Sequence, residues 1–223
     1  MSKYMIHACN DRMWYVNEYL IPSMLKQGIK EEDIILWQDT ECKGNLFSFI
    51  DSCRQLALVK DKGTWHLQDD VLICSDFKEK TEKYDEGIVC GFTTQYDDVR
   101  SPGEYRAKDN IWWSFPCIRI PNEYLADFVR WVDIWVWRDP QWEKWILAKK
   151  GDDLIFNTWA KNYRPNDRVL CLAPNLVEHV DWLIGGTTVN HARQKNKGQV
   201  RSIHWTEEYL VEELKKKLKE RNH

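Results

Sequence analysis

Two adjacent carboxylates, Asp69 and Asp70, interrupt an apolar stretch that runs from Thr64 to Cys74. The apolar residues on both sides indicate that the pair lies where a buried strand ends. Carboxylates at such a place are costly unless a positive group lies against them. A divalent cation that carries a phosphate-bearing substrate is the simplest such partner, and the alternative is a solvated acidic turn. The pair is therefore the first candidate site.

A second acidic pair, Asp152 and Asp153, follows Gly151 and opens a helical pattern. A carboxylate can remove a proton from a substrate hydroxyl when it lies within hydrogen-bond reach of it. Aspartate is also an ordinary residue at helix N-termini, where the helix dipole favours the ionised form and lowers its basicity. Both roles, general base and helix cap, stay open for this pair.

The elements that must position these acids follow from the spacing of apolar residues. Strands are expected at residues 4–9, 33–37, 64–67, 87–92, 110–120 and 169–173, and helices at 14–27, 46–59, 124–137, 140–149, 152–163 and 206–221. The polar segment 93–108 is expected to be a loop. Alternating strands and helices predict an α/β fold with a parallel sheet, whose ligands bind beyond the carboxyl ends of the strands. Asn10, Arg12 and Asp39 follow the first two strands, so we expect them near Asp69 and Asp70.

The composition fits one soluble domain with a sizeable core. Of the 223 residues, 43% are hydrophobic, and the formal net charge is -3, which does not favour tight nonspecific binding to nucleic acid. The seven cysteines form no C-x-x-C pair, and several lie in apolar stretches, as reduced thiols of a cytosolic protein do. Neither a signal peptide nor a run of membrane-spanning length is present, so a cytoplasmic location is expected.

The succession of strand, helix, strand, helix, strand and Asp-Asp resembles the nucleotide-sugar glycosyltransferases of the glycosyltransferase-A fold. Lipopolysaccharide and collagen-galactosyltransferase-like enzymes are the nearest members, and residues 63–73 carry the match. The family's three-residue acidic motif has Gln68 at its first position here. The resemblance implies a single Rossmann-like domain over residues 1–223, with a mostly parallel mixed sheet flanked by helices. Residues 1–92 would form its nucleotide-sugar half and residues 93–205 its acceptor half, followed by the helix 206–221.

The same resemblance implies a metal site and a base. Asp70 would bind Mn²⁺ or Mg²⁺, and His179, in the late segment 174–179, would be a second ligand, although a lone histidine is more often structural. Asp69 would bind the donor ribose or support the metal. The resemblance places the general base at the second acid of the later pair, Asp153, with Asp152 as the alternative.

Further residues would contact the two substrates. Donor contacts are implied for Asn10, Arg12, Asp39, Arg54, His191, Arg193 and Lys195, and acceptor stacking for Trp112 and Trp113. A surface salt bridge is the alternative for Arg54, and a solvated loop is the alternative for the basic residues 191–195.

The expected function is metal-dependent transfer of a sugar from a nucleotide-diphosphate sugar, a UDP-sugar first, to a hydroxyl acceptor. Saccharides, proteins and hydroxymethylated DNA bases all fit as acceptors, the last as in phage-encoded transferases. A non-catalytic carbohydrate- or nucleotide-binding module is one alternative, because 13 tryptophans suit stacking on sugars. A metal-dependent nucleotidyltransferase is the other, although residues 10–14 lack the glycine-rich phosphate loop expected after its first strand.

Overall fold

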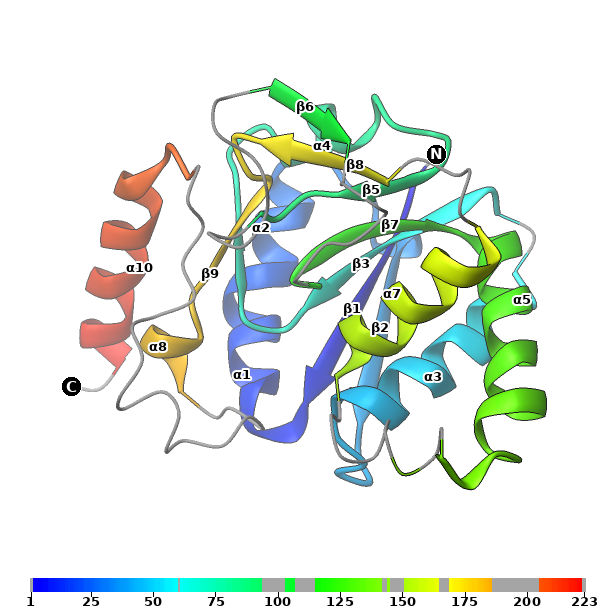
Figure 1. The fold of residues 1–223 in the computed structure, drawn as a ribbon. Coiled ribbons are helices and arrows are strands. Elements are labelled where there is room, and N and C mark those ends of the chain that lie inside the picture. The colour runs from blue at the N-terminus through cyan, green and yellow to red at the C-terminus, as the bar shows by residue number, and fades with distance from the viewer. Residues whose placement is uncertain are drawn as a thin grey trace.

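A computed structural model of the chain describes residues 2–59, 61–93, 103–106, 115–141, 144, 151–164, 169–185 and 205–221. Its fold is α/β, with a mixed sheet of seven strands between two groups of helices (Figure 1). The strand order in the sheet is β2-β1-β3-β7-β5-β8-β6. The predicted fold class is therefore confirmed.

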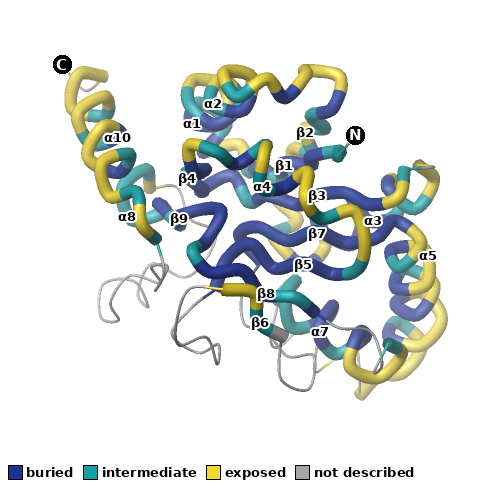
Figure 2. The backbone as a smooth tube through the Cα atoms, turned by 90° about the horizontal axis from the view of Figure 1, so that it is seen from above, coloured by how far each residue is buried: buried dark blue, intermediate teal, exposed yellow. Residues whose placement is uncertain are grey.

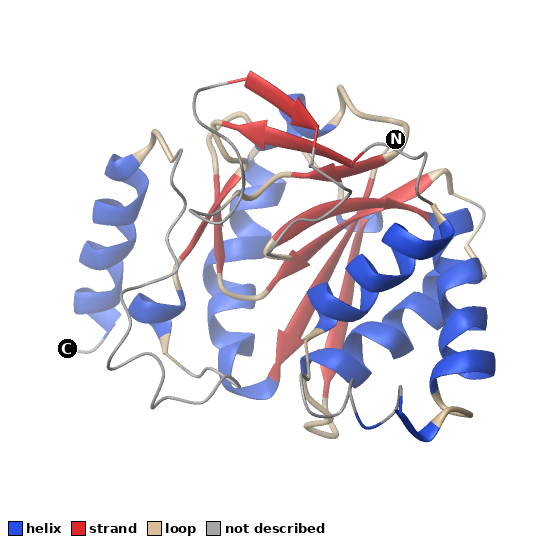
Figure 3. Ribbon diagram, viewed as in Figure 1, coloured by secondary structure: helices blue, strands red, loops and turns tan. Residues whose placement is uncertain are grey.

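Figure 3 separates the strands from the helices that cover them. The sheet contains β1 (Lys3–Cys9), β2 (Ile34–Asp39), β3 (Gly63–Gln68), β5 (Ile88–Cys90), β6 (Gly103–Arg106), β7 (Cys117–Pro121) and β8 (Val169–Ala173). The helices are α1 (Met13–Tyr15), α2 (Ile21–Lys26), α3 (Asn45–Leu56), α4 (Phe77–Thr81), α5 (Asn122–Trp131), α7 (Asp152–Tyr163), α8 (Asp181–Ile184) and α10 (Glu208–Arg221). Two π-helical segments, η2 (Val16–Leu20) and η5 (Val132–Val136), continue α1 and α5, and the short 3-10 turns are η1 (Asn10–Arg12) and η3 (Glu31–Asp33).

The register of the first three strands fixes where the candidate residues lie. β1 is parallel to both β2 and β3, with Cys9 opposite Asp39 and His7 opposite Gln68. β7 runs antiparallel between β3 and β5, β8 is parallel to β5, and β6 is antiparallel to β8, so five of these seven strands share one direction. The carboxyl ends of β1, β2 and β3 therefore meet at one edge of the sheet, as predicted.

Both faces of the sheet are covered, which accounts for the nearly continuous apolar strands. Side chains alternate along β1, so Met5 packs against α3, α5 and α7, whereas Tyr4 and Ile6 pack against α1, η2 and α2. Figure 2 shows the central strands β3, β7 and β5 buried and the outward faces of the helices exposed. Trp65 and Leu67 of β3 face the α1 side of the sheet. Because side chains alternate along a strand, Gln68 faces the opposite side, toward α3 and α7.

Three elements differ from the prediction. The segment expected to be a loop, 93–108, contains the strand β6, which pairs with β8. Two three-residue strands, β4 (Val71–Ile73) and β9 (Val177–His179), form a separate antiparallel ribbon that was not predicted. Pattern reasoning misses such strands because three residues show too little alternation, and their partners lie about 100 residues away in the chain.

The remaining helices and strands largely follow the prediction. The described part of the strand expected at 110–120 begins only at Cys117, and β5 is shorter than expected. The backbone N–H of Gln141 donates to Asp139 Oδ1 at 2.9 Å, the predicted cap of the helix that begins at Pro140. All seven cysteines lie in the described ranges, and none forms a disulfide. No helix in these ranges combines the length and apolar character needed to cross a membrane.

Candidate active site

A buried arginine bridges the first acidic pair. Arg12 lies in η1, directly after β1, and its Nη1 is 2.8 Å from Asp69 Oδ1 and 2.5 Å from Asp70 Oδ2. Its Nε donates to the carbonyl oxygen of Gly185 at 3.0 Å, and the backbone N–H of Cys9 donates to Asp69 Oδ2 at 2.7 Å. Arg12 is 6% exposed and each aspartate 5%, so these charges interact where water screens them little.

His179 brings a second positive group to Asp70. Because β9 pairs with β4 directly after the acidic pair, His179 Nε2 lies 3.1 Å from Asp70 Oδ2, while Nδ1 lies 3.3 Å from Asp181 Oδ1. Burial lowers the pKa of His179, but Asp70 outweighs it and raises that pKa to about 9. Burial would raise the pKa of Asp70, yet His179 and Arg12 hold it well below its ordinary value. For Asp69, burial and the charge of Asp70 outweigh Arg12 and raise the pKa.

Besides His179 Nδ1, two polar atoms of this cluster lack a hydrogen-bond partner among the residues that the structure describes. They are Asp70 Oδ1 and Arg12 Nη2, and both are fully buried. One is an acceptor on an ionised carboxylate and the other a donor on a guanidinium. A buried polar atom left in this way is costly, so an unpaired acceptor and an unpaired donor in one cluster indicate a place for a ligand with both charges.

The second acidic pair lies beside the same strand end, on the other face of the sheet. Asp152 begins α7, and the side chain of Gln68, at the end of β3, lies close enough to favour the ionised form of its carboxyl. Its Oδ1 accepts the backbone N–H of Asp153 at 2.9 Å. Burial, and then the charge of Asp153, raise the pKa of Asp152 to about 7. A carboxyl with that pKa is suited to accept a proton near neutral pH.

Asp153 has a more local role in this arrangement. Its Oδ1 accepts the backbone N–H of Leu154 at 2.7 Å, one residue further along the helix. Burial raises the pKa of Asp153 as well, but no contact with Gln68 accompanies it. Of the two acids, Asp152 is therefore the one joined to the end of β3.

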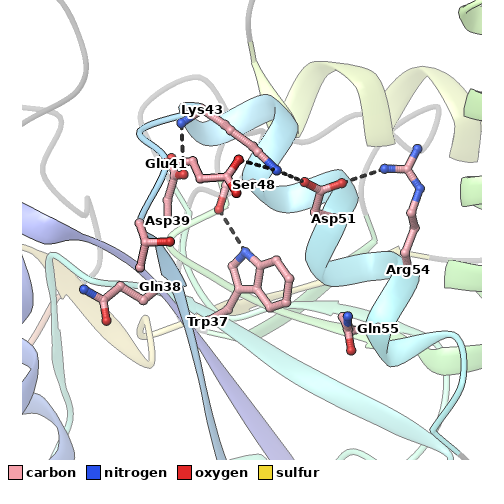
Figure 4. Close-up of a pocket in the computed structure, with 10 residues that line it drawn as sticks. Trp37, Gln38, Asp39, Glu41, Lys43, Ser48, Asp51, Arg54 and Gln55 are labelled. Atoms are coloured by element: carbon pink, nitrogen blue, oxygen red, sulfur yellow. Dashed lines mark hydrogen bonds and ion pairs between the residues drawn. The ribbon is translucent and has the colours of Figure 1, made fainter.

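An open pocket of about 360 Å³ lies next to this edge, between the end of β2 and α3. Figure 4 shows its lining, in which the Trp37 indole donates to Ser48 Oγ at 3.1 Å. Gln38 lines the same pocket and donates to Asn10 Oδ1 at 2.8 Å, which connects the pocket to η1 and Arg12. The pocket is thus linked through Gln38 to the turn that carries Arg12.

Two of the residues predicted to contact the sugar donor line this pocket, and the charged group of each already has partners within the protein. Asp39 accepts the backbone N–H groups of Lys43 and Gly44 at 2.9 and 2.8 Å and so shapes the loop after β2. Arg54 forms ion pairs with Asp51 at 2.6 Å and Asp133 at 2.5 Å, the surface salt bridge that was its alternative reading. Both are placed at a pocket, but their charged groups are already paired.

The structure thus brings Arg12, Asp69, Asp70 and His179 into direct contact and places Asp152 on the neighbouring side of β3. Trp112, Trp113, His191, Arg193 and Lys195 lie outside the described residues. Sequence reasoning missed the roles of Gln68 and Asp181. Strand alternation could have found Gln68, because it places that side chain on the face opposite Asp69.

The donor set fits a hard divalent cation. Asp70 supplies a buried carboxylate oxygen without a partner in the described part of the chain, and the His179 imidazole lies against the same carboxylate. Oxygen ligands with one neutral imidazole suit Mn²⁺ and Mg²⁺, so His179 would release its proton when it binds the cation. The oxygens of Asp69 already accept from Arg12 and Cys9, so that residue supports the site rather than adding a ligand.

No protein-family model and no curated protein matches this sequence. Solved structures with a related fold include A197 from STIV, at a TM-score of 0.49 and 15% identity, over 80% of this chain and 85% of that one. The inositol-1-phosphate CTP transferase from T. maritima aligns at a TM-score of 0.45 and 10% identity, over 81% and 89% of the two chains. HddC from Yersinia pseudotuberculosis aligns at 0.32 and 11%, over 57% and 80%. The function proposed for this chain rests on its own side chains.

Proposed function

We propose that this protein is a metal-dependent glycosyltransferase that moves a sugar from a nucleotide-diphosphate sugar to a hydroxyl acceptor. The observation that supports the proposal is the meeting of two unlike acidic pairs at the end of β3. One pair is neutralised by Arg12 and His179 and keeps Asp70 ionised, whereas the other leaves Asp152 with a pKa of about 7. Transfer to a hydroxyl needs both kinds of carboxyl, one to hold a cation and one to accept a proton.

On the donor side, Asp70 and His179 would hold Mn²⁺ or Mg²⁺. A cation bound there would offset the charge that develops on the departing nucleoside diphosphate. The neighbouring pocket would take the nucleoside, with Trp37 and Gln38 in its lining and Asn10 bonded to Gln38. UDP-sugars are the first donors to test.

On the acceptor side, Asp152 would take the proton of the attacking hydroxyl. The acceptor oxygen bonds to the anomeric carbon, the bond from that carbon to the diphosphate oxygen breaks, and its electron pair leaves with the nucleoside diphosphate. Gln68 holds the Asp152 carboxylate beside the end of β3, next to the donor side. Saccharides, proteins and hydroxymethylated DNA bases all present a hydroxyl suited to this step.

The test is a thermal-shift panel of nucleotide sugars with and without Mn²⁺. A ligand that binds only the folded state raises the unfolding temperature, so we expect one nucleotide series to give a shift that requires the metal. The matched control is Asp70→Asn, which keeps the side-chain shape but removes the charge and should lose the metal-dependent shift. A wild-type protein that responds to no nucleotide sugar would contradict the proposal.

A nucleotidyltransferase is the second candidate, because an ionised Asp70 beside Arg12 suits a metal-bound triphosphate equally well. The two reactions differ in their products. A glycosyltransferase releases a nucleoside diphosphate from a nucleotide sugar, whereas a nucleotidyltransferase releases pyrophosphate from a nucleoside triphosphate. A non-catalytic binding module would release neither. Product analysis with both substrates therefore separates the three functions.

A further inference from the structure

The geometry of Arg12 points to an anion-binding role that its contacts with the aspartates do not use. A guanidinium has five N–H donors. Arg12 directs Nη1 at both carboxylates and Nε at the carbonyl of Gly185, which leaves the two N–H groups of Nη2. Nη2 is buried and has no hydrogen-bond partner within the described ranges. Nε and Nη1 therefore fix the guanidinium, and the two N–H groups of Nη2, here termed the open edge, have no hydrogen-bond partner in these ranges.

We propose that the open edge of Arg12 binds a phosphoryl oxygen of the donor diphosphate, beside a cation on Asp70. The inference rests on the proposed function and extends it, because it assigns one arginine to two tasks. Asp69, Asp70 and Gly185 hold the guanidinium plane, so little side-chain freedom is left to lose when the anion binds. Arginine suits this double task because its planar fork presents separate donor edges, whereas lysine carries a point charge.

The unpaired acceptor of the same cluster defines the kind of ligand. Asp70 Oδ1 attracts a cation and repels an anion, whereas Arg12 Nη2 does the reverse. A metal–diphosphate complex carries both charges and would satisfy both atoms. A single water molecule could also accept from Nη2 and donate to Oδ1, and the experiment must separate these two occupants.

The experiment uses Mn²⁺ and inorganic pyrophosphate as probes, in calorimetric titrations of the full chain. Mn²⁺ is titrated first, and pyrophosphate is then titrated into the Mn²⁺-loaded protein. Arg12→Lys keeps the positive charge against the aspartates but lacks the second edge. We expect its Mn²⁺ affinity to stay within about threefold of wild type and its pyrophosphate affinity to fall about tenfold or more, the value of one charge-assisted hydrogen bond. The control Arg164→Lys changes an arginine that pairs with Asp127 and belongs neither to the cluster nor to the pocket lining, so it should leave pyrophosphate affinity unchanged.

A second pair of variants is compared in case the Arg12→Lys protein folds poorly. The single variant Asp69→Asn keeps Arg12. The double variant, Arg12→Gln with Asp69→Asn, removes the arginine and one of the two carboxylates that it neutralises, so the net charge of the cluster is the same as in wild type. Pyrophosphate should bind the double variant about tenfold or more weakly than the single one.

Equal pyrophosphate affinities in either comparison would overturn the inference and leave a water molecule as the occupant of the open edge. If Mn²⁺ fails to bind the wild-type chain, the metal of the proposed function is wrong. Pyrophosphate titrations in EDTA then decide the role of Arg12 alone, and equal affinities of wild type and Arg12→Lys would overturn it.

Discussion

Two Asp-Asp pairs lie beside the end of one strand and differ in almost every electrostatic respect. Asp69 and Asp70 contact the guanidinium of Arg12, and Asp70 also contacts His179. Asp152 and Asp153 accept backbone N–H groups, Gln68 lies beside Asp152, and neither carboxylate has a basic side chain as an ion-pair partner among the described residues. The pKa of Asp70 is consequently lowered, whereas that of Asp152 is raised to about 7.

The difference shows that neighbours, and not the dipeptide itself, set the chemistry of each pair. Burial raises the pKa in both places, but only at Asp70 do positive charges reverse its effect, whereas the pKa of Asp69 stays raised. A pair that stays ionised is suited to hold cations, and a pair that titrates near neutrality is suited to move protons. The following variants break or sharpen this contrast, beginning with the largest effect.

Removing the proposed proton acceptor should have the largest effect. Asp152→Asn keeps the shape and the hydrogen-bond acceptor for Asp153 but cannot take a proton, so transfer should slow by roughly 10²–10⁴-fold. Asp153→Asn serves as the matched control, and we expect less than about a tenfold loss, because its carboxylate accepts a backbone N–H of α7, as a helix-capping residue does. The measurement is the rate of nucleoside diphosphate release. A larger loss for Asp153→Asn would assign the base to the second acid instead.

Removing the guanidinium of Arg12 from the first acidic pair should lower the free energy of unfolding. Arg12→Met leaves two buried carboxylates without their guanidinium, and breaking a buried ion pair in this way costs about 3–5 kcal/mol of unfolding free energy. Urea unfolding at neutral pH measures it. Arg54→Met is the control, because that exposed arginine should contribute about 1 kcal/mol or less. Equal losses for the two variants would mean that Arg12 does not compensate the pair.

The raised pKa of Asp152 makes a prediction about stability and pH. The folded state binds this proton more tightly than the unfolded state, so ionisation of Asp152 lowers the unfolding free energy as the pH rises from about 4 to about 7. Asp152→Asn removes this loss. The variant should therefore be at least about 1 kcal/mol more stable than wild type near pH 8, with a smaller gain near pH 5. Urea unfolding at both pH values checks it, and a variant no more stable than wild type near pH 8 speaks against a raised pKa.

The smallest effect is expected from the residue that joins the two pairs. The side chain of Gln68 favours the ionised form of Asp152, so Gln68→Leu should move the acidic limb of the pH–rate profile upward by roughly half a unit to one unit. Gln55→Leu, in the pocket, is the control and should leave the profile in place. A downward shift for Gln68→Leu would contradict the contact as described.

Much of this arrangement could be predicted because it is local in the sequence. Apolar periodicity located β1, β3, α3 and α7, and the parallel succession placed Arg12 and Asp70 at one edge. The meeting of His179 with Asp70 was expected only from a family resemblance, since about 110 residues separate them and a three-residue ribbon joins them.

What could not be predicted depends on side-chain geometry. No pattern in the sequence indicates that Arg12 bridges both aspartates with one nitrogen and leaves another without a partner in the described ranges. The opposite pKa shifts of Asp70 and Asp152 have the same origin. Burial acts on both pairs, and only three-dimensional packing decides which pair has basic side chains beside it. The division of the chain into a donor half and an acceptor half stays a prediction.

The central claim is that the first pair binds the metal-bound donor and the second moves the proton. Calorimetric titration of UDP with Mn²⁺ into Asp70→Asn and Asp152→Asn tests this claim most directly. We predict that Asp152→Asn binds with wild-type affinity, whereas Asp70→Asn loses at least about tenfold. Equal binding by both variants, or a loss confined to Asp152→Asn, would contradict the division of labour between the two pairs.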